Sequence, residues 1–143
     1  MKKKLSKEYK NMCKKYSKDI MKDAKLASKD PFDWFPGLKV FVDHLYFMRE
    51  YYRLGENVWA QEDENAPTRE QCLNMILAEY EDWQHCEDKY YEVVYKEDSK
   101  AFAVYSKVSE SREETGDLFL KEYNYHRKRF FELLSDYIEF LWD

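Results

Sequence analysis

The sequence contains little glycine and little proline, with three residues of each among 143. All-β sandwiches and barrels need many turn residues, and nucleotide-binding α/β folds need glycine-rich loops, so this scarcity favours helices joined by few connections. At this length we expect a single helical domain over residues 1–143. The chain is 44% hydrophobic and 18% aromatic, so it has enough apolar side chains to build a core.

Long apolar runs are also missing. No run approaches the roughly 20 residues needed to cross a bilayer, and the N-terminal Met-Lys-Lys-Lys leads into a lysine-rich segment rather than the apolar core of a signal peptide. We therefore expect a cytoplasmic protein without a membrane partner. Cys13, Cys72 and Cys86 form no Cys-x-x-Cys pair, which indicates reduced thiols rather than a disulfide framework or a zinc site.

Apolar residues recur at steps of three and four in four segments, which predicts four amphipathic helices. Their expected ranges are 4–28, 36 or 38 to 54, 68–96 and 117–142. Thr68 and Gln71 have the spacing of a capping box at the start of the third helix. We divide the chain into a basic N-terminal helix, 1–30, and a bundle body, 31–143.

Three connecting segments complete the predicted architecture. The apolar cluster of Phe32, Trp34 and Phe35 is expected to fold onto the core, and residues 56–67 form a long irregular connection. Residues 98–116 are ambiguous: 101–105 fit a short strand or a helical turn, with helix or loop favoured, and 109–116 look mobile. The predicted fold class is all-α, a compact helical bundle of about four main helices with one long irregular connection.

Charge is segregated along the chain. Residues 1–30 carry a net charge of +7 and residues 56–98 a net charge of −10. The simplest interpretation is attraction between these segments within one bundle. Two alternatives are a basic arm that binds nucleic acid and an acidic segment that imitates DNA for a DNA-binding host enzyme. Residues 1–30 contain no arginine, so forked phosphate recognition is missing and nucleic-acid binding is disfavoured.

Few residues have the pattern of a catalytic or metal site. His44, His85 and His126 lie on the three later helices and could converge, but a carboxylate-bridged metal centre needs Glu-x-x-His from two helices. Only Asp82-x-x-His85 comes near this pattern, so we expect no metal and no cofactor. Cys86 could act as a nucleophile with a histidine base, but no local signature supports this, and a structural thiol is favoured.

Residues 113–120 resemble one half of the all-α nucleotide pyrophosphohydrolases of the MazG type. That resemblance implies that Glu114 and Asp117 bind magnesium, one helical turn apart. The upstream Glu-Glu-x-x-Glu of that family has no counterpart in residues 86–102. An acidic first turn that favours the helix dipole explains the same residues, so a non-enzymatic protein is expected and the hydrolase is an alternative.

Two basic and aromatic groups are the candidate ligand-binding or partner-binding residues. They are Tyr123, Tyr125, His126, Arg127 and Arg129 on the last helix, and Arg49, Tyr52 and Arg53 at the end of the second. Guanidinium groups beside aromatic rings can hold a phosphate and stack a base. Two chains meeting at these residues would share a pocket for an anion, whereas ion pairing along the helix face or oligomer packing is the simpler account.

Three short motifs resemble a family of small uncharacterised proteins of bacteriophages and prophages. The matching residues are Pro31-Phe32-Asp33-Trp34, then Phe41, Leu45, Met48, Tyr51 and Tyr52, and finally Leu141-Trp142-Asp143. The likeness covers residues 31–96 and 118–143, and Leu141 stands where the family has a tryptophan. It implies a viral setting and no catalytic activity. We therefore expect an antagonist of host antiviral defence that stoichiometrically binds a host protein or sequesters an anionic nucleotide signal.

Overall fold

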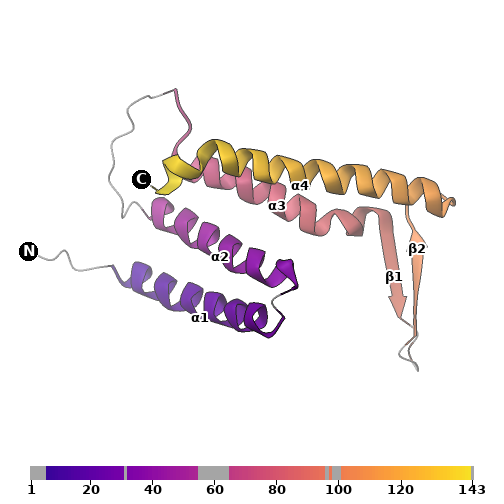
Figure 1. The fold of residues 1–143 in the computed structure, drawn as a ribbon, viewed down its shortest axis with the longest axis horizontal. Coiled ribbons are helices and arrows are strands. Elements are labelled where there is room, and N and C mark those ends of the chain that lie inside the picture. Colours follow the sequence, from indigo (N-terminus) through magenta and orange to yellow (C-terminus); the bar gives the residue numbers. More distant parts are fainter. Residues whose placement is uncertain (1–5, 31, 55–64, 96, 98–100, 143) are drawn as a thin grey trace, which may run out of the picture. The chain divides into compact units, whose positions relative to one another are not determined.

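The computed structural model describes residues 6–30, 32–54, 65–95, 97 and 101–142. Its elements are α1 (Lys7–Lys29), α2 (Trp34–Arg53), α3 (Arg69–Tyr90), β1 (Tyr91–Tyr95), β2 (Phe102–Ser106) and α4 (Arg112–Trp142) (Figure 1). The helical fold class and the four predicted helices are confirmed. Contacts group the chain into two compact units, residues 1–77 and 78–143, so that α3 contributes to both. The single-domain prediction stays a prediction.

In the first unit, α1 and α2 pack against each other through aromatic side chains. Tyr9 contacts Tyr51 and Tyr16 contacts Phe47, each pair edge to face. Such pairs contribute about 0.5–1.5 kcal/mol beyond their buried area. The buried apolar residues of this unit are Met12, Val42, Leu45, Cys72, Leu73, Ile76 and Leu77.

Two carboxyl groups meet at the α1–α2 interface. Asp23 of α1 is buried, and its Oδ1 lies 3.5 Å from the ammonium nitrogen of Lys39 on α2. Asp43 lies one helical turn after Lys39. Burial, together with a hydrogen bond and the charge from Asp23, raises the pKa of Asp43 to about 7. Asp43 is therefore partly protonated under neutral conditions.

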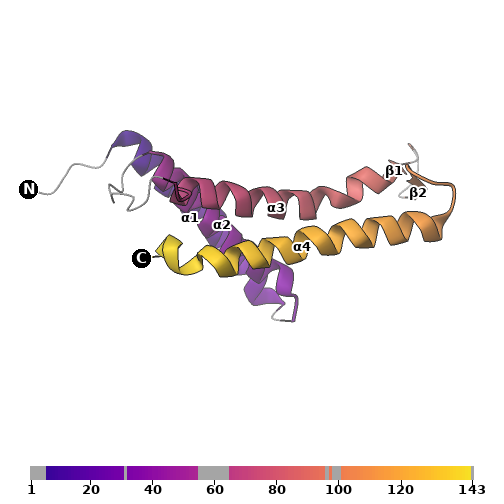
Figure 2. The ribbon, with the colours of Figure 1, turned by 90° about the horizontal axis from the view of Figure 1, so that it is seen from above.

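In the second unit, residues 78–90 of α3 run antiparallel to α4, and the two helices lie side by side in both views (Figures 1 and 2). The indole of Trp83 is 2% exposed and contacts the rings of Tyr123, Phe130 and Phe131. The buried apolar residues of this unit are Tyr80, Trp83, Cys86, Phe130, Leu133, Leu134 and Leu141. An aromatic cluster therefore forms its core.

Strands β1 and β2 form an antiparallel hairpin between α3 and α4. Tyr91 pairs with Ser106 and Tyr95 with Phe102. The predictions of a helix to residue 96 and of helix or loop at 101–105 are therefore wrong. Valines and aromatic residues suit both an apolar helix face and a strand, and the pairing of two distant segments decides between them.

Capping residues explain where the helices begin. Thr68 and Gln71 form the predicted capping box, with the Gln71 amide N–H donating to Thr68 Oγ1 and the Thr68 N–H donating to Gln71 Oε1. At α4 the Ser111 hydroxyl accepts a hydrogen bond from the Glu114 N–H. The helix consequently starts at Arg112, inside the segment predicted to be mobile.

Contrary to the prediction, the cluster around Trp34 does not fold onto a core. Phe32 is 95% exposed, Trp34 is 59% exposed, and Trp34 and Phe35 begin α2 after the Asp33 cap. Capping by Asp33 starts the helix here and turns these rings toward solvent. The connection predicted at 56–67 falls mostly in residues 55–64, outside the described residues. None of the described helices is both long and apolar enough to span a membrane.

Candidate interaction surface

The β1–β2 hairpin carries a group of exposed apolar side chains. Opposite residues in a hairpin share a face, and successive residues alternate between faces. The register therefore places Val93 and Tyr95 beside Val104 and Phe102 on one face. Tyr95 is 73% exposed and Phe102 is 61% exposed, and their rings contact each other. This set of four residues is called the hairpin face below.

The base of the hairpin is fixed to the helix pair. The ring of Tyr91 packs edge to face on Phe119 of α4. The Lys107 N–H donates to the Tyr90 carbonyl, and its ammonium group donates to the Asp88 carbonyl, both at 2.9 Å. The hairpin projects away from the α3–α4 pair instead of lying along it (Figure 1). The hairpin is consequently held in place at its base, and the hairpin face beyond the base is exposed.

Among the described residues, the sheet consists of these two strands alone. Each strand thus has one edge whose N–H and C=O groups are not used by a neighbouring strand. An isolated two-stranded hairpin is marginally stable in water, and a third strand or further packing stabilises it. Exposed valines, exposed rings and open edges together make the hairpin suited to pairing with another chain.

A polar network lies along the α3–α4 interface next to the aromatic core. Nδ1 of His126 lies 2.6 Å from Oε2 of Glu79, across from α4 to α3. Glu122 accepts hydrogen bonds from the Lys89 ammonium group and, at 2.6 Å, from the Tyr90 hydroxyl. These two donors lower the pKa of Glu122 to about 2. Glu122 is therefore ionised at neutral pH and ties the end of α3 to α4.

The residues predicted to bind a ligand on α4 have different surroundings. Tyr123 packs against Trp83 and Phe119, whereas Tyr125 is 60% exposed and its ring contacts that of His126. His126 belongs to the polar network described above.

The arginines of the same group are bonded along their own helix. Arg129 pairs with Glu132 at 3.5 Å, and Arg127 donates to the side chain of Asn124 at 3.3 Å. Tyr125 is thus the member of the predicted group that is most open to a partner, and the predicted binding role of the set stays a prediction.

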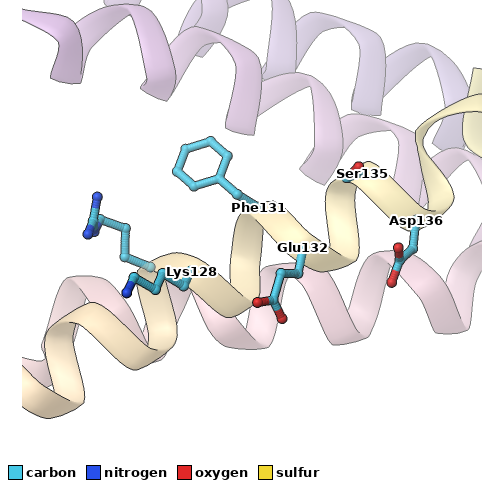
Figure 3. Close-up of a pocket in the computed structure, with 6 residues that line it drawn as sticks. Lys128, Phe131, Glu132, Ser135 and Asp136 are labelled. Carbon is cyan, nitrogen blue, oxygen red and sulfur yellow. The ribbon is translucent and has the colours of Figure 1, made fainter.

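A shallow depression of about 590 Å³ runs along one stretch of α4. Phe131 projects to one side of the helix, and Glu132 and Asp136 project to another (Figure 3). Its lining residues are Arg127, Lys128, Phe131, Glu132, Ser135 and Asp136. Because two cations, Arg127 and Lys128, line one end and two carboxylates, Glu132 and Asp136, line the other, this depression has no single-sign field that would attract a phosphate.

The predicted group at the end of α2 lies in the first unit. The guanidinium of Arg49 lies over the Tyr46 ring, and that of Arg69 lies over the Tyr52 ring. Arg53 pairs with Glu50 through a hydrogen bond from each of two guanidinium nitrogens. Ion pairing along the helix face, the simpler account, describes Arg53 well.

The basic first helix has its own shallow depression of about 430 Å³. Met21 and Leu26 are exposed within it, and four lysines surround them. The lining residues are Lys18, Met21, Lys22, Lys25, Leu26 and Lys29. This surface presents point charges without arginine forks, as the sequence predicts.

Each of the remaining candidates for catalysis has its own local surroundings. Glu114, at the start of α4, accepts a hydrogen bond from the Ser109 hydroxyl. His44 of α2 and His85 of α3 are both exposed, and Nδ1 of His85 lies 3.6 Å from Oδ2 of Asp88. Burial raises the pKa of the Cys86 thiol, which favours its protonated form over the nucleophilic thiolate.

Comparison with known proteins adds no family to this picture: no protein-family model matches the chain, and no curated protein or solved structure matches it significantly.

The hairpin is the feature that the helical periodicity missed. Tyr-Glu-Val-Val-Tyr at 91–95 and Phe-Ala-Val-Tyr at 102–105 are rich in β-branched and aromatic residues, and a short polar segment separates them. Two such segments with a polar connection between them are typical of a β-hairpin, and this composition could have predicted the hairpin in spite of the helical periodicity.

Proposed function

We propose that this chain is a non-enzymatic interaction protein that binds a protein partner through the β1–β2 hairpin. The observation that carries the proposal is the exposed hairpin face on a two-stranded sheet with open edges. A partner strand would pair with an open edge through main-chain hydrogen bonds, and partner side chains would cover Tyr95 and Phe102. The hairpin base, fixed to Phe119, limits the ordering cost of binding.

The resemblance to small bacteriophage proteins supports a viral setting for this interaction. We place the partner among host antiviral defence proteins in the host cytoplasm, where stoichiometric binding would block its action. Sequestration of an anionic nucleotide signal is the weaker alternative, because Tyr123, His126 and Arg129 already contact neighbouring side chains.

The proposal is tested by crosslinking and by a matched pair of double variants. A photo-crosslinking residue at position 104 is expected to capture one host protein, and native mass spectrometry should give a complex of fixed stoichiometry. The variant Tyr95→Ser with Phe102→Ser is expected to bind that protein about 30-fold more weakly, as hot-spot aromatics typically do.

The control replaces two exposed apolar residues of α4, Leu118→Ser with Leu120→Ser, and should bind as the unmodified chain does. In hosts that carry the defence protein, the efficiency of phage plating should fall with the hairpin variant and stay unchanged with the control. Equal binding by the hairpin variant and the control would contradict the proposal. Magnesium-dependent turnover of nucleoside triphosphates that is lost on Glu114→Ala would contradict the non-enzymatic role.

A further inference from the structure

Three potential metal ligands converge between α3 and α4, away from the hairpin face. Glu79 and Asp82 lie three residues apart on α3 and so share a helix face, and His126 of α4 lies opposite them. One ligand atom from each residue lies within 4.8 Å of the other two. Glu79 and His126 are half-buried and Asp82 is exposed, so an ion from solvent can reach the cluster.

The second nitrogen of the same imidazole also faces a carboxylate. Nε2 of His126 lies 3.6 Å from Oε1 of Glu122, which the Lys89 ammonium group and the Tyr90 hydroxyl hold in position. A neutral imidazole has one N–H and one lone pair. Without an ion, a proton on Nδ1 accounts for the 2.6 Å contact with Glu79. A divalent cation would take the place of that proton, with Nδ1 as the ligand and the ring proton on Nε2, the nitrogen that faces Glu122.

This arrangement has both parts of a protein metal site: the ligands themselves and a group that orients the histidine ligand. Histidine ligands commonly direct their second nitrogen to a carboxylate, which fixes the tautomer and the ring orientation. Here Glu122 lies on the Nε2 side of the ring, in that orienting position, and Nδ1 lies on the side of Glu79. One nitrogen and two carboxylate oxygens form a donor set that suits zinc and similar divalent ions, with water completing the coordination.

We propose that Glu79, Asp82 and His126 form a binding site for one divalent transition-metal ion of the zinc type, which crosslinks α3 to α4. Glu122 is a positioning residue for the imidazole. The proposal is independent of partner binding by the hairpin, so either can fail without the other.

Calorimetric titration of the chelator-treated full chain with zinc chloride tests the site. We expect one ion per chain. Asp82→Asn should weaken zinc binding by about tenfold or more, and because Asp82 is exposed, this variant keeps the fold. The matched control is Asp88→Asn, another exposed acid of α3, which should bind zinc as the unmodified chain does.

Nuclear magnetic resonance of the imidazole nitrogens separates a metal site from a plain ion pair. In the presence of zinc, Nδ1 of His126 is expected to show the shift of a metal-bound nitrogen while Nε2 keeps its proton. Glu122→Gln should weaken zinc binding less than Asp82→Asn does, because its effect passes through the imidazole. Absence of zinc binding, equal binding by the two aspartate variants, or a doubly protonated His126 in saturating zinc would overturn the proposal.

Discussion

The α1–α2 pair encloses a carboxyl pair at its interface, whereas the α3–α4 pair encloses aromatic rings and holds an ionised glutamate at its edge. Asp43 beside Asp23 has a raised pKa, and Glu122 beside Lys89 and Tyr90 has a lowered one. Between pH 3.8 and about 7 the first unit therefore binds a proton on folding, and between about pH 2 and 4.5 the second releases one. The two pairs are expected to respond to pH in opposite directions although both are antiparallel helix pairs.

The largest expected effect is the loss of the aromatic core of the α3–α4 pair. Trp83→Ala removes a buried indole that contacts the rings of Tyr80, Tyr123, Phe130 and Phe131, and should lower the free energy of unfolding by about 3–5 kcal/mol. Urea denaturation followed by circular dichroism measures this change. The control Trp34→Ala removes an indole that is mostly exposed and should cost less than about 1 kcal/mol. Equal costs would show that aromatic packing does not hold this pair.

The sequence predicts a structural feature of this protein well when the interactions that form it are between residues close together in the chain. Helical periodicity and the Thr68–Gln71 capping box depend on residues within one or two turns, and the structure confirms both. The hairpin depends on pairing between 91–95 and 102–106, which periodicity along one segment does not reveal.

The candidate sites follow the same division. The basic and aromatic residues of α4 were visible as a run, yet their partners on α3 were not. The contact of Glu79 with His126 joins residues 47 positions apart, and nothing in the local sequence marks it. The exposure of Phe32 likewise depends on where the chain turns after α1, because composition alone assigns such a ring to a core.

The ion pair at the edge of the α3–α4 pair is expected to contribute less to the free energy of unfolding than the aromatic core does. Glu122→Gln removes the charge that accepts hydrogen bonds from Lys89 and Tyr90, and should lower the free energy of unfolding by about 1.5 kcal/mol at pH 7. Because its folded pKa is about 2 and its ordinary value is 4.5, this contribution is complete above pH 4.5 and is lost as the pH falls through 2. Denaturation of both proteins between pH 2 and pH 6 should therefore converge at the acid end. Glu132→Gln, an exposed acid of the same helix, should show no such convergence.

The smallest expected effect, of about 1 kcal/mol, comes from the carboxyl pair of the first unit. The folded pKa of Asp43 is about 7 and its ordinary value is 3.8, so folding favours the protonated form. This contribution is complete below pH 3.8 and is lost as the pH rises through 7, which is opposite in direction to that of Glu122. Asp43→Asn keeps a neutral side chain of the same shape next to Asp23, and should make the stability at pH 8 closer to that at pH 5. Denaturation curves at these two pH values measure the difference. If the variant and the unmodified chain lose equal stability over this interval, protonation of Asp43 beside Asp23 does not couple α1 to α2, and the pH response of the molecule comes from the α3–α4 pair.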